Sequence, residues 1–290
     1  MIKQTLSFVK GLLICASLME LMTIKEFVAK RKQELRDELK SLPRVPHLCI
    51  IRVGDDPASE AYVKGKSKDA MEVGFYCDVI VLPSDTSEAG LLSLIREKNL
   101  DKEIDGILVQ LPLPKGISTK AINDTIAPEK DVDGFVLNSH FIPCTPKGIV
   151  SYLQEEGFLF AGKNAVVLGR SQIVGIPMAR LLLSLDCDVT VLHSKTSDED
   201  RKFYLKHADL VVSAIGKMGY LNESYEFKKD AILVDVGINR DENGKLHGDF
   251  VPSLPVKMQT PVPGGVGLLT RLALLENLLE ATKNELLRRK

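Results

Sequence analysis

The stretch that decides the fold is VVLGRSQIVGIPMARLL, residues 166–182. An apolar run from Ala165 to Leu168 predicts a buried strand, which stops at Gly169. An apolar helical pattern then begins near Val174. Strand, glycine turn and helix in this order are typical of the first unit of a dinucleotide-binding fold. There, glycine lets the backbone approach a pyrophosphate, and the helix N-terminus offers free N–H groups.

The glycine pattern departs from the usual G-x-G-x-x-G fingerprint. Ser171 stands where the second glycine belongs, and Gly175 comes one residue late. Taken alone, the motif is also compatible with a strand-to-helix turn that binds nothing. A second apolar strand, from Val189 to Leu192, favours the dinucleotide-binding interpretation, because such a strand is the next part of the same unit.

The end of this second strand indicates which cofactor is expected. An NAD enzyme usually places Asp or Glu there to hold the ribose 2′-hydroxyl. Here the strand is followed by a hydroxyl at Ser194 and a cation at Lys195, and Arg170 lies near the first turn. These groups suit a 2′-phosphate, so the sequence predicts NADP in preference to NAD.

Composition limits the class of protein. The chain has 290 residues and is 44% hydrophobic, enough for one large or two medium domains. Its 38 basic and 39 acidic residues give a net charge of −1, which argues against a general nucleic-acid-binding protein or a polybasic membrane anchor. The five cysteines form no C-x-x-C pair, which predicts reduced thiols in a cytoplasmic protein and argues against a structural zinc site.

Residues 1–21 stand apart from the rest of the chain. They carry Lys3 and Lys10 and then an apolar run from Leu12 to Leu18, a pattern similar to that of a secretory signal peptide. The run is too short to span a bilayer, and no disulfide pattern follows it. We expect an N-terminal extension, or a true start at Met19 or Met22.

Helices and strands alternate along the chain. Helices are expected over 23–42, 87–99, 119–126 and 148–155, and from Ser59 to a stop at Gly74. Strands are expected over 48–53, 76–82, 106–110, 210–215 and 232–236. Thr23 and Glu26 have the spacing of a capping box. The pattern predicts an α/β protein with parallel sheets and two domains, 22–147 and 148–267, with a last helix in 268–290 that returns to the first domain.

Four short motifs outside the glycine turn could carry chemistry. Tyr62 and Lys66 are four residues apart on one helix face, where partial burial would lower the pKa of the lysine. Gln110 ends a parallel strand, where open α/β sheets bind ligands. Asp131 and Asp133 are two apart in a loop with no third metal ligand in range, and residues 260–267 (TPVPGGVG) are rich in proline and glycine. Each motif also has an alternative without function. These are a surface helix for Tyr62 and Lys66, an incidental amide for Gln110, a turn for the two acids and a linker for residues 260–267.

In combination these motifs are specific. In chain order they are S-x-x-Y-V-x-x-K-x-K, VQLPLP, KDVDGF, PCTPKG, GRSxxVGxP, DVGIN and TPVPGGVG. From about Met19 to the C-terminus the chain resembles the bifunctional methylenetetrahydrofolate dehydrogenase/methenyltetrahydrofolate cyclohydrolase family. The resemblance implies a folate-binding catalytic domain and a Rossmann-like NADP domain with the active site between them. It also implies a homodimer formed through the cofactor domain, with tetrahydrofolate derivatives as substrates.

The resemblance also implies roles for individual residues. Lys66 would be the acid/base, Tyr62 would pack on the folate, Gln110 would hydrogen-bond Lys66, and Asp133 would bind the pterin. The further residues implied for the substrate are Val109, Leu111, Pro263, Gly264 and Gly265. Those implied for the cofactor are Gly169, Arg170, Ser171, Ser194 and Ile238, and no metal is implied.

Two departures from the family pattern lie beside the folate site. Leu268 replaces the usual proline, and residues 135–142 form a shortened segment without the usual Asn-x-Gly-x-Leu pattern. One alternative is a monofunctional NAD-linked dehydrogenase, which the missing acid after residue 192 disfavours. Another is a non-catalytic nucleotide-binding regulatory protein. That alternative is disfavoured because a decaying site would have little reason to keep Lys66, Gln110 and Asp133 together.

Overall fold

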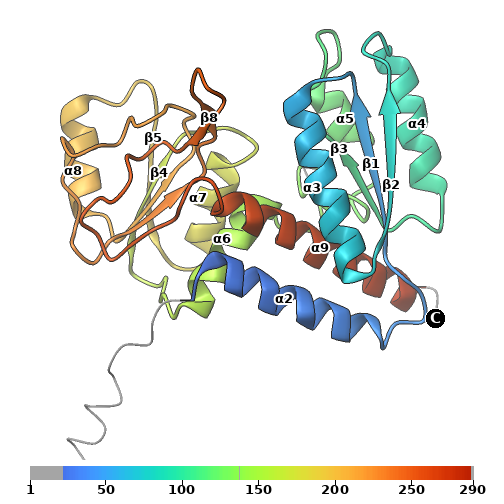
Figure 1. Ribbon diagram of the computed structural model, residues 1–290, viewed down its shortest axis with the longest axis horizontal. Coiled ribbons are helices and arrows are strands. Elements are labelled where there is room, and N and C mark those ends of the chain that lie inside the picture. Colours follow the sequence, from blue (N-terminus) through green and yellow to red (C-terminus); the bar gives the residue numbers. More distant parts are fainter. Residues whose placement is uncertain (1–21, 137, 289–290) are drawn as a thin grey trace, which may run out of the picture.

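The structure is a computed structural model that describes residues 22–136 and 138–288. The expectations for residues 1–21 therefore lie outside the described residues. The chain forms two parallel sheets, with strand orders β2-β1-β3 and β10-β7-β6-β4-β5, and a small antiparallel pair, β8-β9. In Figure 1 the two sheets stand side by side, and helices α2 and α9 run along the base of the molecule. The predicted two-domain α/β architecture is confirmed.

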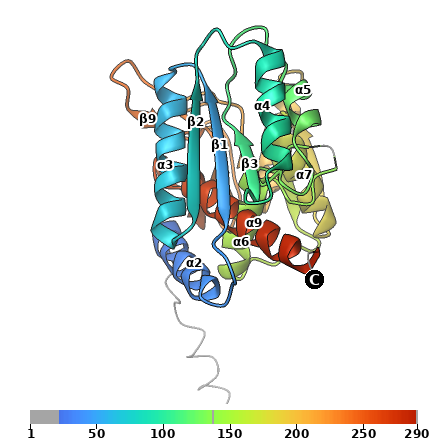
Figure 2. The same ribbon diagram turned by 90° about the vertical axis from the view of Figure 1, so that its right-hand side faces the viewer.

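The three-stranded sheet is buried at β1 and β3, whereas β2 is a largely exposed edge strand. Its strands are β1 (His47–Val53), β2 (Tyr76–Leu82) and β3 (Gly106–Val109). Helices α3 (Pro57–Val73), α4 (Glu88–Leu100) and α5 (Thr119–Thr125) connect and follow them, as Figure 2 shows. Leu48 and Ile50 of β1 pack toward α3, whereas Ile51 packs toward α4 and α5. This alternation is expected for a parallel strand buried on both faces.

The five-stranded sheet carries the start of the 166–182 stretch on β4, the strand next to its β5 edge. Its strands are β4 (Asn164–Leu168), β5 (Asp188–Leu192), β6 (Leu210–Ser213), β7 (Ile232–Asp235) and β10 (Met258–Gln259). The small pair is β8 (Asn239–Arg240) and β9 (Leu246–His247), and the helices are α6 (Cys144–Glu155), α7 (Gly175–Ser184) and α8 (Asp198–His207). Strand β4 lies between β5 and β6 and is parallel to both. The turn after Leu168 follows the end of β4, so it lies at the carboxyl edge of the sheet.

One continuous core joins the two sheets. Helix α9 (Val266–Arg288) packs against α2 (Ile24–Leu39), α3 and α6, and buried side chains from all four helices belong to the same apolar cluster. Asn277 of α9 lies in this core and donates to the carbonyl oxygens of Val132 (2.9 Å) and Ile142 (3.0 Å). The last helix thereby fixes the position of the 131–143 segment.

Most predicted elements are confirmed, including the Thr23–Glu26 capping box of α2. Three helices begin earlier than predicted, and α9 is one of them, since it begins at Val266 and not at residue 268. Helix α3 begins at Pro57 because the Asp56 side chain caps it, accepting from the Ser59 N–H at 2.7 Å. Helix α6 begins at Cys144, and Pro146 is tolerated in its first turn because the N–H groups there need no helical partner. Helix α8 and the β8-β9 pair were not predicted.

None of the described helices is long and apolar enough to cross a membrane.

Candidate active site

Lys66 and Gln110 meet at the carboxyl end of the three-stranded sheet. Lys66 projects from α3 and is only 7% exposed, and its Nζ donates to Oε1 of Gln110 at 3.2 Å. The amide nitrogen of Gln110 donates to the Leu111 carbonyl oxygen at 2.7 Å, which turns Oε1 toward the lysine. The structure therefore brings together two residues that lie 44 positions apart in the sequence.

A cavity of about 310 Å³ opens in front of this pair. Tyr62, Leu111 and Asp133 line it from the catalytic side, and Ile238 lines it from the nucleotide side. Burial raises the pKa of the Tyr62 phenol, so the ring is a neutral apolar wall. Val109 is buried within β3 and is not one of the lining residues.

The two acids of KDVDGF have different surroundings. Asp131 is 2% exposed and accepts from the N–H groups of Gly134 (3.2 Å) and Val136 (2.8 Å), so it shapes the loop. Burial raises the pKa of Asp131 to about 6. Asp133 instead faces the cavity, next to Cys144, whose thiol pKa is held well above its usual range by burial and by that carboxylate. Within the described ranges no group of three or more His, Cys, Asp or Glu side chains could hold a metal ion.

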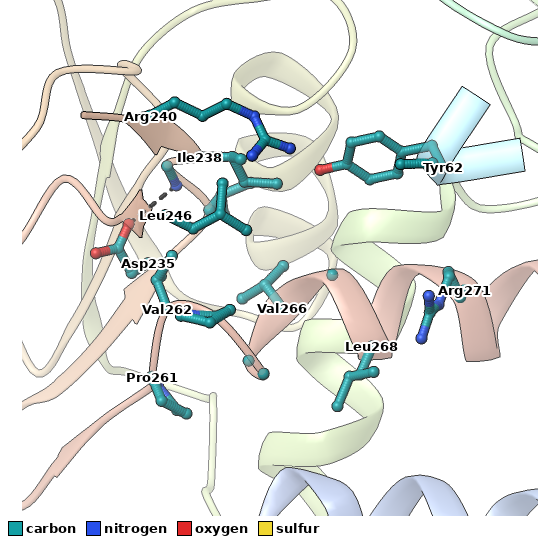
Figure 3. A pocket seen from close by; sticks show the side chains of 17 residues that line it. Tyr62, Asp235, Ile238, Arg240, Leu246, Pro261, Val262, Val266, Leu268 and Arg271 are labelled. Carbon is teal, nitrogen blue, oxygen red and sulfur yellow. Dashed lines mark hydrogen bonds between the residues drawn. The ribbon is translucent and has the colours of Figure 1, made fainter. Parts of the chain in front are cut away.

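A second cavity of about 250 Å³ continues along the same wall. Pro263, Gly264 and Gly265 line it. Gly265 has no room for a side chain, since a Cβ there would lie 2.1 Å from the Pro261 carbonyl oxygen. Figure 3 shows Tyr62 across this cavity from Ile238 and Arg240, with Leu268 and Arg271 reaching it from α9.

Each of the two departures noted in the sequence borders a cavity, but not the same one. Leu268 lines the second cavity, and α9 begins two residues before it, at Val266. The shortened 135–142 segment borders a separate cavity of about 450 Å³ that faces α7 and includes Leu111 and Ile173. The Lys66–Gln110 pair is intact beside both departures.

The turn after β4 requires glycine at two positions. Gly169 has a φ of +109°, and a Cβ on Gly175 would lie 2.2 Å from the Gly169 carbonyl oxygen. Ser171, which stands where the second glycine of the motif would be, accepts hydrogen bonds from the start of α7. Its Oγ accepts from the N–H groups of Val174 (3.1 Å) and Gly175 (3.3 Å) at the start of α7. The first turn of α7 carries no acidic residue that would repel an anion.

A fourth cavity, of about 260 Å³, lies beside this turn. Gly169, Arg170 and Ser194 line it together, whereas Lys195, the cation named with them from the sequence, is not among its lining residues. The cations that join Arg170 there are Arg201 and Lys217, which lie 5.5 Å and 5.4 Å from the ring centre of Tyr220. Sequence reasoning missed both because α8 and the loop after β6 carry no recognisable motif.

Two buried acids hold the loops around the nucleotide side of the site. Asp249 is fully buried and accepts from the Ser213 hydroxyl (2.8 Å) and from the N–H groups of Ile215 (2.9 Å) and Lys217 (2.8 Å). Asp235 accepts from the N–H groups of Gly237 (2.9 Å) and Asp249 (2.9 Å). Burial raises the pKa of Asp235 to about 6. The network ties the loop after β6 to the loop that carries Ile238.

We expect Asp249→Asn to lower the thermal midpoint by about 5 to 10 °C. The asparagine NH₂ would face backbone N–H groups that now donate to the carboxylate, which leaves buried donors unpaired. Thermal unfolding followed by circular dichroism measures the shift. Asp230→Asn, at an exposed position in the same domain, is the control. Equal midpoints for the two variants would contradict this role of Asp249.

Fold and site together define a class of protein: a two-domain enzyme with a lysine-containing cavity on one side and a dinucleotide turn on the other. Family comparison makes the class specific. The protein-family model described as "Tetrahydrofolate dehydrogenase/cyclohydrolase, catalytic domain" matches residues 22–133. The corresponding "NAD(P)-binding domain" model matches residues 143–286. The chain belongs to the tetrahydrofolate dehydrogenase/cyclohydrolase family.

Individual relatives match this sequence over nearly its whole length. The bifunctional protein FolD of Staphylococcus epidermidis is 43% identical over 271 residues, which are 89% of this chain and 93% of that protein. The crystal structure of FolD from Campylobacter jejuni is 42% identical with a TM-score of 0.85, covering 89% of this chain and 96% of that one. The Trypanosoma brucei enzyme, complexed with NADP cofactor and inhibitor, is 31% identical with a TM-score of 0.85, covering 92% of this chain and 98% of that one.

Proposed function

We propose that this chain oxidises 5,10-methylenetetrahydrofolate with NADP⁺ and hydrolyses the 5,10-methenyl product to 10-formyltetrahydrofolate. The observation that carries the proposal is the buried Lys66–Gln110 pair, which faces a cavity that Ile238 of the nucleotide domain also lines. One cavity thus presents an amine for proton transfer and a wall that belongs to a dinucleotide site. Membership of the family supports the same pair of activities.

On the substrate side, Asp133 binds the pterin through its ring N–H donors, and Tyr62 packs on the folate. Leu111 and the backbone of Pro263, Gly264 and Gly265 form the remaining walls. Val109 contributes indirectly, since it is buried in the strand that positions Gln110. These contacts hold the bridging carbon in place, and alignment is the main contribution of a protein to a hydride transfer.

On the cofactor side, Gly169 and Ser171 hold the pyrophosphate at the start of α7. Arg170 and Ser194 bind the 2′-phosphate, and Ile238 contacts the nicotinamide. The cavity residues fit a doubly charged phosphate, because cations line it and no Asp or Glu does. NADP⁺ supplies the hydride acceptor when bound.

Lys66 acts in the hydrolytic step. Water adds to the methenyl carbon, and protons must leave the water and reach the ring nitrogen that departs. A neutral amine can accept the first proton and deliver it, and the Gln110 amide oxygen keeps Nζ directed into the cavity.

Turnover of methylenetetrahydrofolate with NADP⁺ and NAD⁺ in parallel tests the proposal. Acid is added afterwards to convert formyl product to the methenyl form for measurement. We expect turnover with NADP⁺ and no methenyl accumulation before acid. Turnover with NAD⁺ alone would favour the monofunctional NAD-linked alternative. No turnover in a protein that still binds nucleotide would favour the regulatory alternative.

We further propose a homodimer formed through the cofactor domain in the cytoplasm. Strand β5 is an outer strand of its sheet, and Leu183 on the adjoining helix α7 is 57% exposed. An open strand edge beside apolar side chains suits pairing with a second copy. Cys49, Cys77, Cys144 and Cys187 are free thiols, in keeping with a reducing compartment. Light scattering that gives only a monomer mass at micromolar protein concentration would contradict the dimer.

A further inference from the structure

A buried ion network lies one helical turn from Lys66. Asp69 of α3 is 6% exposed and binds two cations, one on each carboxylate oxygen. Oδ1 lies 2.7 Å from Lys32 Nζ, and Oδ2 lies 2.7 Å from Arg271 Nε. Lys32 also pairs with Glu72 at 2.9 Å. The network therefore links α2, α3 and α9 behind the wall of the active site.

Stability alone does not account for this network. Lys32 and Asp69 are almost fully buried, and desolvation of such charges offsets much of their attraction. An apolar cluster of the same volume would hold the three helices together at least as well. The network does, however, give the Arg271 guanidinium a fixed position.

That position faces the substrate cavities. Arg271 lines both the cavity at Lys66 and the cavity at Pro263, and its side chain is 28% exposed. Gly65 makes room for it, because a Cβ on that residue would lie 2.4 Å from Arg271 Nη1. A guanidinium held against a helix backbone in this way keeps donors available to a ligand.

The cavity at Pro263 carries excess positive charge. Arg240 lines this cavity on the side that faces Tyr62. The charges of Arg240 and Arg271 both lower the pKa of Tyr62, although burial raises it by more. Asp235 is the acid among the lining residues, and its carboxylate is engaged by the Gly237, Asp249 and Phe250 N–H groups. A ligand group that occupies this cavity should therefore be anionic.

We infer that Arg271, held by Asp69, binds a carboxylate of the glutamyl tail of the folate substrate, with Arg240 as a second cation at the same end. The inference rests on the proposed function. If the pterin lies at Asp133, the p-aminobenzoyl ring passes Tyr62, and the anionic tail reaches the cavity at Pro263. Arg271 is then a specificity residue for substrates that carry glutamate, and Asp69 is a positioning residue.

The test compares Arg271→Gln with the wild-type chain on two dehydrogenase substrates, methylenetetrahydrofolate and its pteroate analogue without glutamate. Asp69 keeps Lys32 as a partner in this variant, so the fold is preserved. We expect KM for the glutamate-bearing substrate to rise about tenfold, with kcat within about twofold. KM for the pteroate analogue should stay unchanged. Lys64→Gln, at an exposed position on α3, is the control.

A KM that rises equally for both substrates, or for neither, would overturn the inference and leave the proposed function intact. Arg271→Lys should recover part of the discrimination, because a cation remains but the two-pronged geometry is lost. A wild-type chain that turns over neither substrate would contradict the proposed function, and the inference with it. The two failures are therefore distinguishable.

Discussion

Lys66→Met is expected to reduce the cyclohydrolase rate by about 100-fold to 10,000-fold, the range of general acid–base catalysis. Lys66 is the lysine among the residues that line the cavity, and it is 7% exposed, so water cannot easily replace its amine. Methionine keeps the volume and apolar stem but cannot carry a proton. Dehydrogenase activity should fall less, because the hydride moves directly between substrate and cofactor.

Hydrolysis of methenyltetrahydrofolate, followed without cofactor, measures this effect. Lys64→Met is the matched control, since its side chain is 74% exposed and pairs with Glu60 on the surface of the same helix. It should retain near wild-type rates. Cyclohydrolase activity of Lys66→Met close to that of the control would show that the acid/base assignment is wrong.

Ser194→Asp is expected to lower kcat/KM for NADP⁺ by about 100-fold to 1,000-fold. The new carboxylate would lie in the cavity shared by Arg170 and Arg201, where the proposed 2′-phosphate binds. It would repel that phosphate and compete for both cations. With NAD⁺ the same carboxylate could accept from the 2′-hydroxyl, so kcat/KM should stay the same or rise.

Steady-state rates with each cofactor give the ratio of kcat/KM for NADP⁺ to kcat/KM for NAD⁺. Ser224→Asp introduces the same charge at an exposed position of the same domain and should leave the ratio unchanged. Equal losses with NADP⁺ and NAD⁺ in Ser194→Asp would place the phosphate elsewhere. Arg201 and Lys217, which also line the cavity, would then be the next positions to vary.

Elements with strong local signals could be predicted from the sequence. The turn at Gly169, the Thr23 cap and the strand before Gln110 depend on a few neighbouring residues. A last helix within residues 268–290 was also predicted, and the structure has it as α9. The starts of α3 and α6 were less accurate, because Asp56 and the Pro143–Pro146 segment define those ends by side-chain and backbone detail.

Contacts that depend on tertiary structure could not be predicted. Asp69 and Arg271 are 202 positions apart, and only the packing of α9 on α3 brings them together. The role of Asp131 as the anchor of its loop was also hidden, because Asp133 two residues later carries an identical side chain. Arg201 joins the nucleotide cavity because helix α8 lies beside β4.

The central claim is that one cavity, with Lys66 at its base, serves both reactions. Inhibition of the two activities by a single non-reactive folate analogue tests this most directly. The dehydrogenase is assayed with NADP⁺ and methylenetetrahydrofolate, and the cyclohydrolase with methenyltetrahydrofolate under the same conditions. The account predicts competitive inhibition with the same inhibition constant for both. Inhibition of one activity without the other would contradict it.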